Sequence, residues 1–182
     1  MKNRKKIEKI IEVPKELNLR IEENNVVVKS SEGENKKKFN FKDIKTKIED
    51  HKLILFKEKG TKKDKKLINT LAAHIENMVK GLQKKYEYII EICSVHFPMN
   101  VKSENNKLII KNFLGERKER IIKLMKGVDV EVKGNKIYIK SLDKDKAGTQ
   151  AAQIEIISRI SNKDKRIFQD GLWIIKKEKG RK

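Results

Sequence analysis

The residue types that most often carry chemistry, histidine and cysteine, are few in this sequence. The histidines are His51, His74 and His96, and the one cysteine is Cys93. They do not form the paired clusters of a zinc motif, so the sequence predicts no metal site. Cys93 occupies an alternating apolar stretch, where a small packed residue is favoured over a nucleophile.

Phosphate-binding loops and catalytic pairs are also missing from the pattern. The glycines are scattered and match neither a dinucleotide-binding nor a Walker motif. Asp143, Asp145 and Asp170 stand among lysines beside a predicted helix start and a predicted turn, where capping and turn-forming roles are favoured. We therefore predict that the protein is not an enzyme and uses neither a cofactor nor a small-molecule substrate.

Lysine and arginine are the abundant charged residues of this sequence. The 182 residues include 46 Lys plus Arg against 26 Asp plus Glu, a net charge of +20. A thermophilic surface predicts more balanced charge, whereas so large a surplus points to a polyanionic partner. The cations concentrate in five segments, which read as loops and termini: residues 2–9, 57–66, 117–126, 159–166 and 176–182.

The kind of polyanion follows from the aromatic content. Aromatic residues make up 5% of the chain, too few for a platform on which successive unpaired bases stack. Contact with the phosphates of structured RNA fits better. The alternative is a basic protein-interaction module that binds an acidic partner.

The elements that must position these cations occur twice. Pro14 and Pro98 are 84 positions apart, as are Lys52 and Lys136, and similar stretches surround each member of a pair. Two more matches are "RIEENNVVVKS" with "VKSENNKLIIKN" and the segments around Asp64 and Asp145, which are 81 positions apart. Four matches in the same order indicate two copies of one unit. We predict two domains, at residues 1–82 and 83–182.

Each copy contains short alternating strands followed by one helix. This pattern predicts an α+β fold of two tandem, similar domains, each with small antiparallel sheets packed on one helix. Thr61 or Asp64 is expected to cap the first helix and Gly81 to end it, while Gly148 suggests that the second helix lies close to its sheet. Strands are expected at residues 26–28, 39–41, 53–56, 86–93, 108–110, 128–132 and 137–139.

The location of the protein is predicted from what the chain lacks. The first residues do not match a signal peptide, and the apolar runs are too short to span a bilayer. A single cysteine excludes an intramolecular disulfide. We expect a cytoplasmic protein that does not associate with membranes.

Two longer stretches carry a family resemblance. The segments "MVKGLQKKYEYIIEICSVHFPMNV" and "DKAGTQAAQIEIISRISNKDKRIFQDGLWI" resemble the archaeal/eukaryotic branch of the large-subunit ribosomal protein family L-six. The specific points are "HFPMNV", the helix entry at residues 148–152 and "FQDG". Lys85 and Ser94 depart from the glycine and tyrosine that are usual in the family at these places.

The resemblance implies a structural role in the cytoplasmic ribosome, with one copy bound to large-subunit rRNA and to neighbouring ribosomal proteins. The contact is expected near the sarcin–ricin loop and the base of the factor-binding stalk, mostly through the second domain and the C-terminal end. Carried onto this sequence, the motifs point to Lys163, Lys165, Arg166, Asp170 and Gly171. Charge and position add the basic end, Lys176, Lys177, Lys179, Arg181 and Lys182.

Trp173, the only tryptophan, lies in a predicted strand just before this basic end. The strand follows the second helix as residues 86–93 follow the first. We expect it to be folded, with Trp173 packing against the protein rather than stacking on a base.

Overall fold

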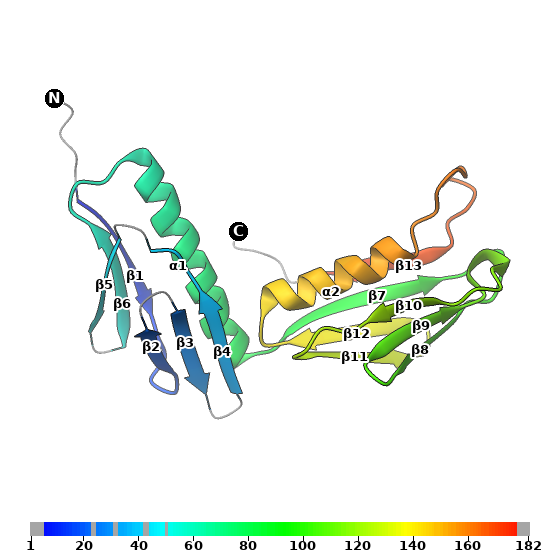
Figure 1. The fold of residues 1–182 in the computed structure, drawn as a ribbon, viewed down its shortest axis with the longest axis horizontal. Coiled ribbons are helices and arrows are strands. Elements are labelled where there is room, and N and C mark those ends of the chain that lie inside the picture. Colours follow the sequence, from blue (N-terminus) through cyan, green and yellow to red (C-terminus); the bar gives the residue numbers. More distant parts are fainter. Residues whose placement is uncertain (1–5, 23–24, 31–32, 42–43, 50, 178–182) are drawn as a thin grey trace. The chain divides into compact units, whose positions relative to one another are not determined.

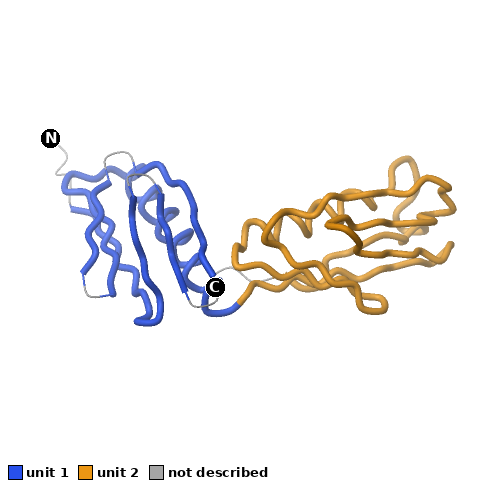
Figure 2. The backbone as a smooth tube through the Cα atoms, turned by 60° about the horizontal axis from the view of Figure 1, so that its bottom comes forward, with its two compact units in different colours: residues 1–84 blue, residues 85–182 orange. Residues whose placement is uncertain are grey.

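The computed structural model describes residues 6–22, 25–30, 33–41, 44–49 and 51–177. The chain divides into two compact units, residues 1–84 and 85–182 (Figure 2). Each unit holds small antiparallel sheets and one α-helix (Figure 1), which confirms the predicted α+β fold with two tandem, similar domains. Within the described residues, no helix has the length and apolarity needed to cross a membrane.

The first unit has two three-stranded sheets, ordered β1-β6-β5 and β2-β3-β4, with α1 packed on both. Its three consecutive valines lie in β3 and are fully or almost fully buried. The elements are β1 (Ile7–Glu12), β2 (Asn18–Glu22), β3 (Asn25–Ser30), β4 (Gly33–Lys38), β5 (Lys45–Glu49), β6 (Lys52–Lys57) and α1 (Lys62–Gln83).

One expected strand is wrong. Residues 39–41 follow β4 as a loop, although Phe39 and Phe41 are both buried and their ring centroids lie 6.2 Å apart. The strand itself is the charged segment "GENKKK", which lies at the end of its sheet, where one side of its backbone has no neighbour among the described strands. Charged residues suit such an edge. The apolar alternation at residues 39–41 therefore identified buried side chains correctly but not the strand.

The first helix begins as expected and ends later. Thr61 caps it, because the Thr61 backbone N–H donates to Asp64 Oδ2 at 2.7 Å and Asp64 N–H donates to Thr61 Oγ1 at 3.4 Å. Gly81 was expected to end the helix, but α1 continues to Gln83. Leu82 is 2% exposed, so another apolar contact extends the helix past the glycine.

The second unit has sheets ordered β10-β9-β8 and β11-β12-β7-β13. The strands expected at residues 86–93, 108–110, 128–132 and 137–139 are confirmed in β7, β9, β11 and β12. The elements are β7 (Tyr86–Cys93), β8 (Asn100–Glu104), β9 (Lys107–Lys111), a 3₁₀ turn (Phe113–Gly115), β10 (Arg120–Lys123), β11 (Val128–Lys133), β12 (Lys136–Ser141), α2 (Lys144–Ile157) and β13 (Gly171–Lys176).

The second unit repeats the first, with one addition. Six described strands precede the helix in each unit. In the second unit, β13 follows the helix and pairs antiparallel with β7, so that Trp173 lies opposite Glu91. The strand that corresponds to β7 in the first unit is β1, which ends its sheet order among the described strands. The expected folded strand around Trp173 is therefore confirmed.

The close approach of α2 to its sheet is visible at Gly148. A Cβ atom on Gly148 would lie 3.2 Å from the hydroxyl oxygen of Tyr88 in β7. Ala147, Ala151 and Ile154 on the same helix are fully buried. Small residues thus set the distance between helix and sheet in the second unit.

We predict that Gly148→Leu lowers the free energy of unfolding of the second unit by about 1–3 kcal/mol, because the added side chain forces helix and sheet apart. Urea titration followed by fluorescence measures this change, since the only tryptophan lies in β13. Gln153→Leu, on an exposed position of the same helix, serves as control and should shift the midpoint little. Equal effects of the two substitutions would contradict the packing argument.

Candidate nucleic-acid interface

The segment between α2 and β13, residues 158–170, brings the predicted cations together; we call it the basic loop. Lys163, Lys165 and Arg166 are all exposed on it. The loop leaves the helix after Ile157 and returns at Gly171 to β13. Its conformation therefore decides where these three cations point.

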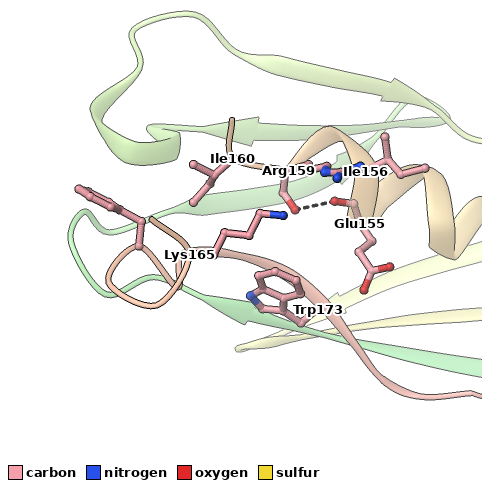
Figure 3. A pocket seen from close by; sticks show the side chains of 8 residues that line it. Glu155, Ile156, Arg159, Ile160, Lys165 and Trp173 are labelled. Atoms are coloured by element: carbon pink, nitrogen blue, oxygen red, sulfur yellow. Dashed lines mark hydrogen bonds between the residues drawn. The ribbon is translucent and has the colours of Figure 1, made fainter. Parts of the chain in front are cut away.

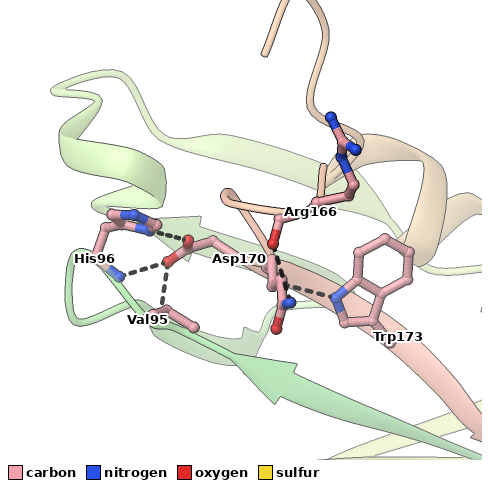
Figure 4. Close-up of polar contacts among 6 residues, drawn as sticks. Val95, His96, Arg166, Asp170 and Trp173 are labelled. Carbon is pink, nitrogen blue, oxygen red and sulfur yellow. Dashed lines mark hydrogen bonds and ion pairs between the residues drawn. The ribbon is translucent and has the colours of Figure 1, made fainter. Parts of the chain in front are cut away.

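Asp170 ties the end of the basic loop to the segment after β7 (Figure 4). Its Oδ1 accepts hydrogen bonds from the backbone N–H groups of Val95, at 2.7 Å, and His96, at 3.0 Å. Its Oδ2 lies 2.6 Å from His96 Nδ1, which donates because an ionised carboxylate only accepts. Asp170 is 1% exposed, whereas the His96 side chain remains 32% exposed, so the contact joins a buried carboxylate to a partly exposed segment.

The Asp170 carboxyl is held in its charged form. Burial by itself raises its pKa, but the backbone N–H of His96, the His96 side chain and the backbone N–H of Val95 outweigh that effect and leave the pKa below its ordinary value. A buried, negatively charged group repels phosphate. Asp170 is thus suited to positioning the basic loop rather than to contacting a polyanion.

A stack of side chains supports the same loop. The rings of His96 and Phe168 lie 4.7 Å apart with an interplanar angle of 21°. The ammonium of Lys163 lies 4.5 Å from the centroid of the Phe168 ring, a cation–π distance. Lys163 is thereby placed against the loop while remaining exposed.

Arg166 is oriented by its neighbour. Its Nη2 donates to Asp164 Oδ2 at 2.8 Å, and its backbone N–H donates to Asp164 Oδ1 at 2.9 Å. These hydrogen bonds lower the pKa of Asp164. The side chain of Arg166 is nevertheless 90% exposed, so its guanidinium stays accessible.

Gly171 lets Trp173 fold over the turn. A Cβ atom on Gly171 would lie 3.2 Å from Trp173 Nε1. The same Nε1 donates to the carbonyl oxygen of Gln169 at 3.1 Å. Leu172 N–H donates to Ser158 Oγ at 2.9 Å, so both ends of the basic loop are joined.

The predicted basic end is only partly within the described residues. Lys176 closes β13 and pairs with Glu87 Oε2 at 2.8 Å, and Lys177 is exposed. Hydrogen bonding to Lys176 is the main cause of the lowered pKa of Glu87. Lys179, Arg181 and Lys182 lie outside the described residues.

A pocket of about 220 Å³ opens between the end of α2, the basic loop and β13 (Figure 3). Trp173 donates a hydrogen bond to Gln169 but is 43% exposed there, so the expectation that it packs against the protein is met only in part and one part of the side chain remains open to a partner. The lining residues are Glu155, Ile156, Ser158, Arg159, Ile160, Lys165, Phe168 and Trp173.

Sequence reasoning overlooked Glu155 and treated His96 as solitary. Arg159 stood in the basic segment 159–166, but nothing marked it as part of a pocket. No pattern in the residues around Glu155 indicates its role, because that role depends on β13: Glu155 Oε1 accepts a hydrogen bond from the Ile174 N–H at 3.2 Å. His96 and Asp170 are 74 positions apart, so only the fold brings them together.

Cys93 is half-buried, as expected for a packed residue. Burial, and then the charges of Glu91 and Asp170, raise the pKa of its thiol, so the reactive thiolate is disfavoured at neutral pH. Among the described residues, no group of three or more His, Cys, Asp or Glu side chains is arranged to hold a metal ion.

Comparison with known proteins gives a consistent result. The family described as Ribosomal protein L6 matches residues 13–85 and 97–171, one segment in each half of the chain. Large ribosomal subunit protein uL6 of Archaeoglobus fulgidus is 34% identical over 175 residues, which cover 93% of this chain and 89% of the relative. The proteins of the same name from Sulfurisphaera tokodaii, 39% identical over 92% of this chain and 91% of the relative, and Nanoarchaeum equitans, 40% identical over 90% of each, are also similar.

We predict that Asp170→Ala lowers the free energy of unfolding of the second unit by about 2–3 kcal/mol, because two backbone N–H groups lose their acceptor. Urea titration followed by Trp173 fluorescence measures it. Asp164→Ala removes an acidic residue from the same loop whose interactions are exposed, and should cost less. An Asp170→Ala protein as stable as the wild type would contradict the anchoring role.

Acid should weaken the second unit through the same group. Because the pKa of Asp170 is lower in the folded than in the unfolded state, its contribution is present above about pH 4 and is lost as the pH falls further. We predict that the stability of the wild type falls more steeply below pH 4 than that of Asp170→Asn. Urea titrations at pH 2.5, 4 and 6 measure the difference; parallel curves would contradict the prediction.

Proposed function

The chain belongs to the ribosomal protein L6 family, and on this basis we propose that it is a structural constituent of the large ribosomal subunit that binds large-subunit rRNA through the basic loop. The observation that carries the proposal is the anchored loop itself, in which a buried Asp170 positions three exposed cations. The proposed action is non-catalytic and requires no cofactor.

The proposed contact follows the physics of phosphate binding. Lys163, Lys165 and Arg166 are the groups that neutralise phosphates, and each phosphate contact releases counterions. Asp170 and Gly171 contribute by shaping the turn beneath these cations. Arg166 suits a phosphate contact, because its guanidinium is exposed although Nε and Nη2 also hydrogen-bond Asp164.

The basic end extends the same surface in the proposal. Lys177 follows β13 directly and is exposed, and Lys176 reaches solvent beside Glu87. Lys179, Arg181 and Lys182 add charge by their position in the sequence. The family resemblance favours a binding region near the sarcin–ricin loop and the base of the factor-binding stalk, with other large-subunit proteins as neighbours in the cytoplasmic ribosome.

A basic module for an acidic protein partner is the second candidate, and the net charge of +20 favours it equally. The two differ in what holds the complex together. An rRNA complex dissociates when nuclease removes the RNA, whereas a complex with an acidic protein survives this treatment.

We predict that replacing Lys163, Lys165 and Arg166 together by Ala weakens binding to large-subunit rRNA and lowers the slope of log K against log salt by about 2–3, roughly one for each lost phosphate contact. Filter binding at several salt concentrations measures both quantities. Co-sedimentation with large subunits at moderate salt tests the same variant in the assembled particle.

The matched control replaces Lys45, Lys47 and Lys52 of the first unit by Ala. It lowers the net charge by the same three units but leaves the basic loop intact. Equal losses of affinity in the two triple variants would show that only total charge matters and would contradict the assigned site. A wild-type protein that fails to bind rRNA or large subunits would overturn the proposed function.

A further inference from the structure

The pocket beside Trp173 has a composition that phosphate binding does not explain. We propose that it receives one unstacked nucleobase of the bound RNA, with the base stacked on Trp173 and the adjoining phosphates held by Arg159 and Lys165. The inference rests on the proposed rRNA binding and adds to it a site that selects RNA with a base turned out of its helix.

Trp173 provides a stacking surface that is held in position. Its indole N–H donates to the Gln169 carbonyl at 3.1 Å, and its backbone pairs with Glu91 across β13 and β7. Gly171 lies close enough that a Cβ atom there would meet the indole nitrogen at 3.2 Å. The ring is thus fixed at its edge while 43% of the residue remains exposed, and a base covers such a face without requiring a particular sequence.

The apolar lining continues beside the ring. Ile156 is 64% exposed at the edge of the pocket, and Ile160 and Phe168 are half-buried in its wall. In the free protein, exposing the isoleucine and tryptophan side chains together to water is unfavourable. One flat aromatic ring covers them, whereas a phosphate alone leaves them exposed.

Glu155 decides between the possible occupants. Its side chain lines the pocket (Figure 3). Its Oε1 accepts from the backbone N–H of Ile174 at 3.2 Å, which orients the carboxylate. A carboxylate has room for further donors, and the exocyclic amino group of a base is one. The same carboxylate repels a phosphate or the acidic side chain of a peptide. The pocket therefore fits a base that carries an amino group better than either anion.

The cations complete the site at its rim. Arg159 and Lys165 are exposed and line the same pocket. Both belong to the basic loop, Arg159 at its start just after α2 and Lys165 further along it. A nucleotide whose base enters the pocket brings its phosphates to this rim, so the cations and Trp173 act on one nucleotide.

The single tryptophan of the chain makes the site directly observable. We expect large-subunit rRNA to quench Trp173 fluorescence as it binds, because the base stacks on the indole. Heparin, a polyanion without bases, and polyglutamate, an acidic peptide, should bind the cations without comparable quenching. Quenching by either of these as strong as by rRNA would overturn the base-binding site in favour of a phosphate or acidic-peptide site.

Substitutions test the same site by affinity. Trp173→Leu should weaken rRNA binding about tenfold in filter binding, in keeping with the contribution of one stacked base. Tyr138→Leu, a half-exposed aromatic on β12 of the same unit, is the matched control and should leave the affinity unchanged. Circular dichroism and urea titration establish that each variant is folded.

Glu155→Gln keeps the shape of the pocket but changes the acceptor, and serves if Trp173→Leu fails to fold. Loss of the carboxylate should reduce quenching by rRNA, because the amino group of the base loses its charged acceptor. If the pocket instead held a phosphate, removing this negative charge would raise the affinity for rRNA. If the wild type binds rRNA without quenching and Trp173→Leu binds with full affinity, the base-binding pocket is overturned while the proposed rRNA binding stands. Absence of any rRNA binding would overturn the proposed function and this inference with it.

Discussion

One buried carboxylate holds the basic loop of the second unit in place. Asp170 gathers the Val95 and His96 backbone N–H groups and the His96 ring, and so joins the segment after β7 to the end of the basic loop. A charged group in this position is tolerated because each oxygen is hydrogen-bonded. The junction fixes the end of the basic loop directly before β13, while Asp164 orients Arg166 and Phe168 supports Lys163.

The rest of the stability comes from apolar packing rather than from charge. Pairs such as Lys29 with Glu34 and Lys45 with Glu58 are largely exposed, and pairs of this kind contribute little. The surplus of cations therefore remains a cost in the free protein. Binding a polyanion removes that cost, so stability and partner binding are coupled in this chain.

The fold was largely predictable because it depends on local patterns. Apolar residues at three- and four-residue steps identified α1, and alternation identified β7 and β12. Alternation failed at Phe39 and Phe41, whose side chains enter the core from a loop. Charge marked the basic segment at residues 159–166, and the family resemblance singled out Lys163, Lys165 and Arg166 within it. The pairing of His96 with Asp170 and the place of Glu155 in the pocket depend instead on contacts between distant segments. No local pattern encodes such contacts.

The return of β13 onto β7 has a consequence for how the duplication is built. After each helix the chain has the same choice: the next strand either opens a further unit, as β7 does, or folds back onto its own sheet, as β13 does. The two units thus share six strands and a helix, and β13 adds a fourth strand to one sheet of the second unit. Because β13 returns to its own sheet, the loop between α2 and β13 is fixed at both ends within one unit, through Ser158 at its start and Asp170 at its end.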